Sequence, residues 1–81
     1  GTLSKEQRSA LSDLAKSLSH DLDEKRLYNL FWDISKKHGI TAPEFFKAAY
    51  LVLINRESGP RLAPFIMAIG RERVRKLLEA V

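Results

Sequence analysis

Apolar side chains recur at helical spacing along most of this chain, and no segment sustains the alternation of a half-buried strand. Two such stripes are formed by Leu11, Leu14, Ala15 and Leu18 and by Leu27, Leu30, Phe31 and Ile34. A stripe at steps of three and four residues lets one side of a helix pack against a core. The spacing therefore predicts an all-α fold.

Two helix starts are marked by paired capping residues. Ser4 and Gln7 have the spacing at which each side chain bonds the other residue's backbone amide, and Thr41 and Glu44 repeat it. A proline in the first turn supports the second of these starts. The apolar residues 45–54 follow it with a single charge, so we expect this helix to be central and covered by the others.

The intervening helix has its own boundary signals. Asp21 or Asp23 is a suitable N-cap, and Gly39 supplies the left-handed residue that ends the helix. The cluster of Ser19, His20 and Asp21 is expected to end the helix before it. These signals predict a second helix that begins after Asp21 or Asp23 and ends at Gly39.

Pro60 and Pro64 interrupt the helical pattern in the last third of the chain. A helix that began at Pro60 would place Pro64 where a backbone donor is required and would push Ala63 away from helical angles. We therefore expect a turn over residues 58–63 and a fourth helix from Pro64 to Gly70. A fifth helix is indicated by the stripe Val74, Leu77, Leu78 and Val81. Residues 1–81 are thus predicted to form one compact bundle of about five helices.

Composition limits the classes of function. The 81 residues are enough for a single core, and the net charge of +4 suits a polyanionic partner, although bland domains are often basic too. The absence of cysteine excludes disulfides and thiolate metal sites. The longest apolar run, residues 48–54, is far shorter than the ~20 residues of a membrane span, so we expect a soluble protein without a visible targeting segment.

No group of residues predicts catalysis. Ser19, His20 and Asp21 are the residue types of a hydrolase triad, but neighbours in sequence cannot converge as nucleophile, base and orienting group. His20 and Glu24 offer two metal ligands without an evident third. No glycine-rich phosphate motif is present. We therefore predict no catalytic residue, no metal site and no cofactor within this chain.

Most of the excess positive charge lies in the last third, in Arg56, Arg61, Arg71, Arg73, Arg75 and Lys76. The planar arginine side chain suits phosphates and base edges better than the point charge of lysine. A helix that begins at Pro64 would also leave the amides of residues 65–67 unpaired close to Arg61, an arrangement that holds an anion. The alternative is a tight chain reversal with solvated arginines.

The second helix offers two further candidates. One of its edges carries Lys25, Tyr28, Trp32 and Lys36, a mixture of cations and rings that suits single-stranded RNA. The interpretation we favour is that Tyr28 and Trp32 only widen the buried face. Lys36, Lys37 and His38 complement the helix dipole, with phosphate contact as the alternative.

The segment FFKAAYLVLINRESGPRLAPFIMAIGRERVRKLLE, residues 45–79, resembles the C-terminal end of class I lysyl-tRNA synthetases. There an apolar helix runs into a Gly-Pro-Arg turn, a short apolar helix that ends in glycine, and a basic last helix. The upstream helices are similar in layout but carry weaker motifs. The related glutamyl-tRNA synthetases end in a comparable helical cage, and Gly59-Pro60-Arg61-Leu62 followed by Pro64-Phe65 favours the lysyl type.

The resemblance implies an anticodon-binding domain of a cytoplasmic enzyme that charges tRNA with lysine. Together with the charge pattern, it leads us to expect that RNA is bound by Arg56, Arg61, Arg71, Arg73, Lys36 and Lys37. The nucleotide-binding signatures of class I synthetases are missing here, so ATP and Mg²⁺ would belong to a preceding catalytic domain of the parent chain. The lysine anticodon is rich in uridine, which implies uridine readout. Gly1 and Thr2 suit a piece excised from such a longer protein.

Two other classes remain open. A helical protein-interaction module would use an apolar groove between the fourth and fifth helices, with the arginines as a polar rim. A DNA-binding helix-turn-helix is disfavoured, because the helices after Gly39 and Gly70 lack an exposed face rich in Asn, Gln and Arg. We expect neither a DNA nor a membrane partner.

Overall fold

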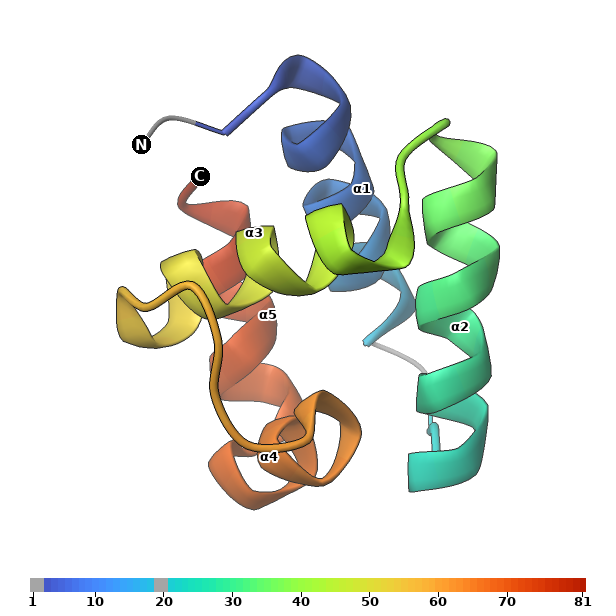
Figure 1. Ribbon diagram of the computed structural model, residues 1–81. Helices are drawn as coiled ribbons and strands as arrows, with labels where there is room; N and C mark the ends of the chain where they lie inside the picture. Colours follow the sequence, from blue (N-terminus) through green and yellow to red (C-terminus); the bar gives the residue numbers. More distant parts are fainter. Residues whose placement is uncertain (1–2, 19–20) are drawn as a thin grey trace.

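The computed structural model describes residues 3–18 and 21–81, which form five α-helices and no strand (Figure 1). The helices are α1 Lys5–Ser17, α2 Glu24–Lys37, α3 Ala42–Ile54, α4 Leu62–Ile69 and α5 Arg71–Glu79. The predicted all-α architecture is confirmed. Ser19 and His20, from the cluster that was expected to end α1, lie outside the described residues. His20 is also the residue that was considered with Glu24, and not favoured, as a metal ligand.

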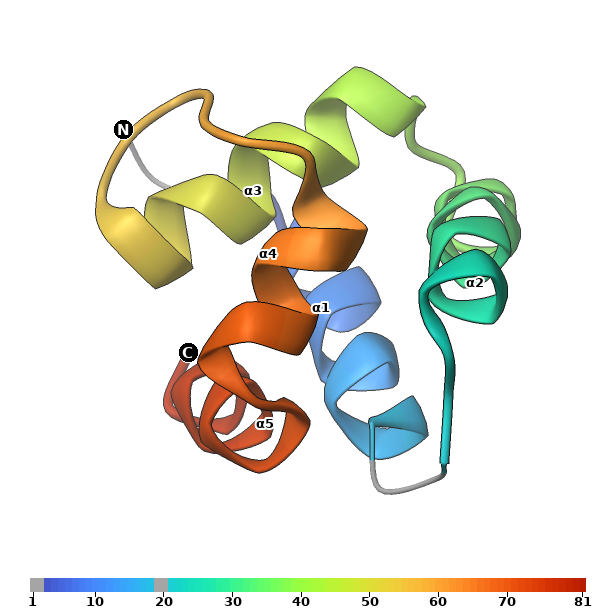
Figure 2. The ribbon, with the colours of Figure 1, turned by 90° about the horizontal axis from the view of Figure 1, so that it is seen from below.

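The helices pack around α1, which contacts α2, α3 and α5, while α4 bridges α2 and α5. Figures 1 and 2 show α2 at one side of the molecule and α5 at the other. All five helices contribute to one core, whose largest fully buried side chains are Phe31, Phe45, Leu11, Leu14, Leu27, Ile66 and Val74. The stripes predicted for α1 and α2 thus face this core, with Leu30 packed against it and only partly buried.

Both predicted capping boxes are formed. The Ser4 hydroxyl accepts from the Gln7 amide at 3.0 Å, and the Thr41 hydroxyl accepts from the Glu44 amide at 3.2 Å. The Gln7 side-chain amide also donates to the Glu44 carbonyl at 2.9 Å, which joins the starts of α1 and α3. The N-cap of α2 is Asp23. Local hydrogen bonding therefore decides where these helices begin.

The expectation that α3 is covered along its whole length is wrong. Phe45, Ala48 and Ala49 are fully buried, whereas residues 51–54 are only partly buried. The chain reverses directly after Ile54, so this end of α3 lies at an edge of the molecule (Figure 1). A bundle of five short helices has too few neighbours to surround it.

The predicted start of α4 at Pro64 is also wrong. The helix begins at Leu62, with Arg61 as its N-cap and Pro64 as its third residue. A proline is tolerated there because amides in the first turn have no acceptor within the helix. The Phe65 amide donates to the Arg61 carbonyl at 3.0 Å, so the amides of residues 65–67 do not form the expected anion site.

The last two helices meet at Gly70, which has a φ of 108° and ends α4 as predicted. In α5, Val74 and Leu78 are buried, whereas Leu77 is exposed, as is Val81 beyond the end of the helix. The buried stripe is therefore narrower than the sequence indicated. None of the described helices combines the length and apolar character needed to cross a bilayer. The described residues also contain no group of three or more His, Cys, Asp or Glu side chains placed to hold a metal ion.

Candidate functional site

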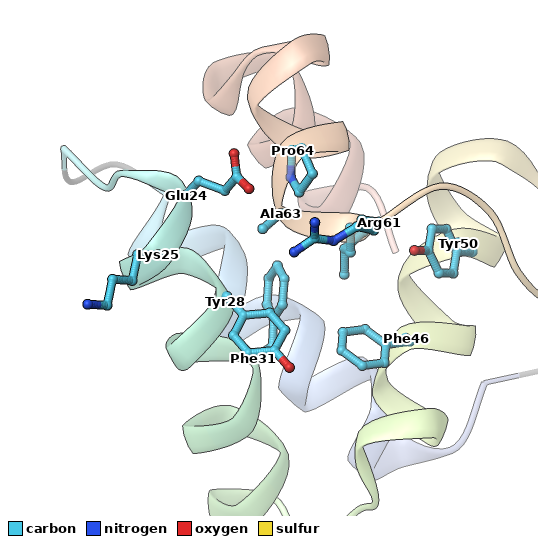
Figure 3. A pocket seen from close by; sticks show the side chains of 10 residues that line it. Glu24, Lys25, Tyr28, Phe31, Phe46, Tyr50, Arg61, Ala63 and Pro64 are labelled. Carbon is cyan, nitrogen blue, oxygen red and sulfur yellow. The ribbon is translucent and has the colours of Figure 1, made fainter.

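A cavity of about 580 Å³ opens between α2, α3 and the start of α4 (Figure 3). Its lining combines four rings with three charged side chains and the first residues of α4: Tyr28, Phe31, Phe46, Tyr50, Glu24, Lys25, Arg61, Leu62, Ala63 and Pro64. Apolar and aromatic walls with a few polar groups are typical of ligand-binding pockets. This cavity is therefore the candidate site.

The turn before α4 is held against α3. Asn55 ends α3 in the left-handed conformation with a φ of 57°, and the Tyr50 hydroxyl donates to the Pro60 carbonyl. A Cβ atom on Gly59 would lie 3.0 Å from Ile54 Cδ1 and 3.1 Å from the Tyr50 ring, so a larger residue would push the turn away. Burial raises the pKa of Tyr50 above its ordinary value of 10.0, and a tyrosine hydroxyl is in either case protonated, and therefore a donor, at neutral pH.

Arg61 is the cation that this turn presents to the pocket. Its guanidinium extends from the start of α4 into the space between α2 and α3 (Figure 3). The Glu24 carboxylate lines the α2 side of the same cavity, and Lys25 points away from it (Figure 3). Within residues 3–18 and 21–81, Arg61 has no ion pair. Its donors are therefore available to a ligand.

The N-terminus of α4 lies at the wall of the pocket. Leu62 and Ala63 line the cavity, and no side chain caps this helix. Their amides lack acceptors within the helix, and the positive end of its dipole favours negative or electron-rich groups. The pocket thus pairs donors on the α4 side with the Glu24 acceptor on α2. Such a set recognises a planar group that carries both acceptors and a donor.

The aromatic edge of α2 is exposed, which overturns the interpretation that we favoured from the sequence. Tyr28 is 46% exposed and Trp32 is 47% exposed. Their rings lie edge to face with centroids 6.1 Å apart, and the Trp32 ring is 6.4 Å from that of Phe46. Tyr28 and Phe46 also line the cavity. The spacing of Lys25, Tyr28, Trp32 and Lys36 was the signal for this surface.

Lys36 and Lys37 lie in the last turn of α2, at the opposite end of this helix from the pocket. The Lys37 ammonium is 3.3 Å from the Asp13 carboxylate, and His38 Nε2 is 3.0 Å from the same oxygen. Asp13 is partly buried. The hydrogen bond from His38, assisted by Lys37, lowers the pKa of Asp13.

The other candidate arginines are spread over the molecule. Arg56 is exposed on the same turn as Arg61 but does not line the cavity. Arg71 lies 3.4 Å from Asp21, and Arg73 is exposed on α5. Arg75 pairs with Glu72 and Glu79 on its own helix. Of the six RNA-binding candidates, only Arg61 therefore lies at the pocket.

Sequence reasoning missed Glu24, Tyr50 and Phe46 as pocket residues. Tyr50 and Phe46 were assigned to a buried helix, and Glu24 was considered only as a metal ligand. No local signal distinguishes them, because the pocket forms where the start of α4 meets α2 and α3. The local pointers to this place were the Gly-Pro-Arg sequence and the spacing of Lys25 and Tyr28 on α2.

Comparison with known proteins assigns the fold to a family. The family described as "Anticodon binding domain" matches residues 1–81. A lysine–tRNA ligase of Cenarchaeum symbiosum is 43% identical over 67 residues, which are 83% of this chain and 13% of that protein. The lysine–tRNA ligase of Thermococcus kodakarensis is 42% identical over 77 residues, 90% of this chain and 14% of that protein. That of Borrelia garinii subsp. bavariensis is 35% identical over 79 residues, 94% of this chain and 15% of that protein.

Proposed function

This chain belongs to the family of anticodon-binding domains, and we propose that it is the C-terminal anticodon-binding domain of a class I lysine–tRNA ligase. The similarity to lysine–tRNA ligases over most of the chain supports the lysyl type. The chain spans only 13% to 15% of the length of these relatives. ATP- and Mg²⁺-dependent charging of tRNA(Lys) is accordingly proposed for a cytoplasmic parent enzyme, in its catalytic domain.

The observation that carries the proposal is the pocket in which rings, Arg61 and the start of α4 converge. Proteins read RNA mainly through unpaired bases, which stack on aromatic side chains and expose their hydrogen-bonding edges. A base of the anticodon loop would lie against Tyr28 and Phe46, with its edge toward Arg61 and the free amides of α4. The anticodon loop of tRNA(Lys) is the proposed ligand.

The polar groups of the pocket suit uracil. A uracil edge has two carbonyl acceptors and one N–H donor between them. Arg61 and the amides of Leu62 and Ala63 provide donors, and Glu24 across the cavity provides an acceptor. We assign to Arg61 the contact with a base carbonyl or a neighbouring phosphate. A uridine-rich anticodon would satisfy this set of groups.

The remaining cations act on the phosphates. Arg56 is exposed on the same turn as Arg61, Lys36 lies in the last turn of α2, and Arg73 is exposed on α5. Lysine and arginine side chains near a nucleic acid release counterions and attract it over several ångströms. These residues, together with Lys37 and Arg71, are proposed to raise the affinity without reading the base sequence.

Titration with a labelled anticodon stem–loop hairpin of tRNA(Lys) at 50 and 200 mM salt tests the proposal. Three phosphate contacts to unpaired RNA give a salt slope of about −2, so we expect the affinity to fall about 20-fold between these concentrations. Binding that is absent or independent of salt would favour the protein-interaction module. Equal affinity for a hairpin with a glutamate anticodon would mean that the domain does not distinguish the two anticodons, and the glutamyl-tRNA synthetase type would remain an alternative.

A further inference from the structure

We propose that Tyr28, Trp32 and Phe46 form an aromatic ledge on which a second unpaired base of the same RNA stacks, beside the base held in the pocket. This inference rests on the proposed function, since it extends the path of the bound strand from the cavity along α2. It assigns RNA contacts to Trp32, which does not line the cavity.

The geometry makes the ledge continuous with the pocket. Tyr28 and Phe46 line the cavity, and the Trp32 ring contacts both of them, with centroids 6.1 Å and 6.4 Å away. Both contacts are edge to face, with interplanar angles of 70° between Tyr28 and Trp32 and 89° between Trp32 and Phe46. Phe46 in turn lies edge to face with the buried Phe31, at an interplanar angle of 88°. Phe46 and Phe31 anchor the ledge to the core, so the exposed rings have a rigid base.

The exposure of the ledge favours a binding role for it. Five large apolar side chains are exposed among the described residues: Tyr28, Trp32, Met67, Leu77 and Val81. Tyr28 and Trp32 are the two that are aromatic, and they are one helical turn apart on α2. Contiguous exposed apolar surface commonly marks a binding site. Because the rings lie next to the pocket, we expect them to bind the same RNA that the pocket binds.

The charges beside the ledge favour RNA over an apolar protein surface. Lys25 and Lys36 flank the rings on the same edge of α2, at three residues before Tyr28 and four after Trp32, and both are exposed. Neither lysine has an ion pair with a described residue. Rings that alternate with cations bind single strands, because bases stack on the rings while the cations neutralise phosphates. A purely apolar partner would have to desolvate both lysines.

Trp32 allows a direct measurement, because it is the single tryptophan of the chain. Its emission should be quenched when the tRNA(Lys) anticodon stem–loop hairpin is added, with the same Kd that a labelled hairpin gives. A fully paired duplex of the same stem should leave the emission unchanged at equal concentration, because it has no free base to stack.

Three variants complete the experiment. Trp32→Ala should weaken hairpin binding about tenfold, the size expected for one lost base stack, and Trp32→Phe should recover most of the affinity because it keeps an aromatic face. Leu77→Ala, at an exposed apolar residue on α5, is the matched control and should bind as the parent chain does. Thermal unfolding of each variant checks that the fold is retained.

The possible failures are distinguishable. If the chain binds the hairpin while Trp32 emission is unchanged and Trp32→Ala keeps full affinity, the ledge is overturned and the proposed function stands; the ledge would then serve a neighbouring protein domain. If the labelled hairpin does not bind at all, the proposed function fails and the ledge with it. If Trp32→Ala does not fold, the parent chain and Trp32→Phe decide instead. Quenching of Trp32 emission by the hairpin, with the affinity retained in Trp32→Phe, supports the ledge, and unchanged emission overturns it.

Discussion

At the scale of the residue, Arg61 owes its position to side chains on other elements. Tyr50 on α3 bonds the Pro60 carbonyl, and the lack of a side chain at Gly59 lets the turn lie against the Tyr50 ring. Arg61 follows directly as the N-cap of α4. Within the Gly-Pro-Arg sequence, Gly59 and Pro60 therefore hold the turn against α3, whereas Arg61 supplies the side chain proposed to bind the ligand.

A second residue-scale interaction ties α1 to the end of α2 and depends on pH. The His38 hydrogen bond and the Lys37 ammonium lower the pKa of Asp13 below its ordinary value of 3.8. A carboxylate whose pKa is depressed in the folded state stabilises the fold above its unfolded pKa, and this contribution is lost as the pH falls through the folded value. We expect the melting temperature to drop more steeply below about pH 4 for the parent chain than for Asp13→Asn. Parallel melting curves between pH 7 and pH 3 check this, and identical pH profiles would contradict the role of Asp13.

Residue-scale features were predictable where they are local. The capping pairs Ser4 with Gln7 and Thr41 with Glu44 lie three residues apart, so the sequence contains both partners. The pairing of Asp13 with His38 joins residues 25 apart, and the exposure of Trp32 depends on which helices do not cover it. Neither follows from spacing, because both are set by how the helices pack.

At the scale of the element, α3 is asymmetric. Its first half is buried under α1 and α2, whereas its last turn is an edge that only partly faces the core. Helical periodicity could not show this, since residues 51–54 are all apolar, as a fully buried turn would be. The start of α4 was mispredicted for a different reason. Proline disfavours helical backbone angles in the residue before it, but this effect is weaker than the tolerance for proline in the first turn of a helix.

The asymmetry of α3 predicts unequal effects of substitution. Phe45 is fully buried against Phe31, with ring centroids 5.5 Å apart, so Phe45→Ala should lower the free energy of unfolding by about 3–5 kcal/mol. Leu51 lies on the same helix but is partly buried, so Leu51→Ala should cost less than about 2 kcal/mol. Denaturant unfolding measures both. Equal losses would mean that α3 is covered along its whole length, as the sequence suggested.

At the scale of the whole molecule, the positive charges and the groups of the candidate site are distributed differently. The net charge of +4 is spread over several faces, whereas the rings and the one pocket arginine are concentrated between α2, α3 and α4. Long-range attraction of RNA is then a property of the entire domain, and recognition of a base is a property of one surface. The composition of the sequence predicted the long-range attraction of RNA. The resemblance of residues 45–79 indicated a surface that recognises a base. The shape of the pocket could not be predicted, because it also depends on α2, where the sequence motifs were weak.

The claim that Arg61 reads the RNA from this pocket is tested most directly by its replacement. Arg61→Ala should weaken binding of the tRNA(Lys) anticodon hairpin by about 1–3 kcal/mol, while stability changes by no more than about 0.5 kcal/mol, because the side chain is exposed. Arg61→Lys keeps the charge but loses the planar fork, so poor recovery indicates contact with a base edge and good recovery a simple phosphate contact. Arg8→Ala, at an exposed arginine of α1 away from the cavity, is the control for lost charge. If Arg61→Ala binds the hairpin as tightly as Arg8→Ala, the pocket does not read the anticodon and the account is wrong.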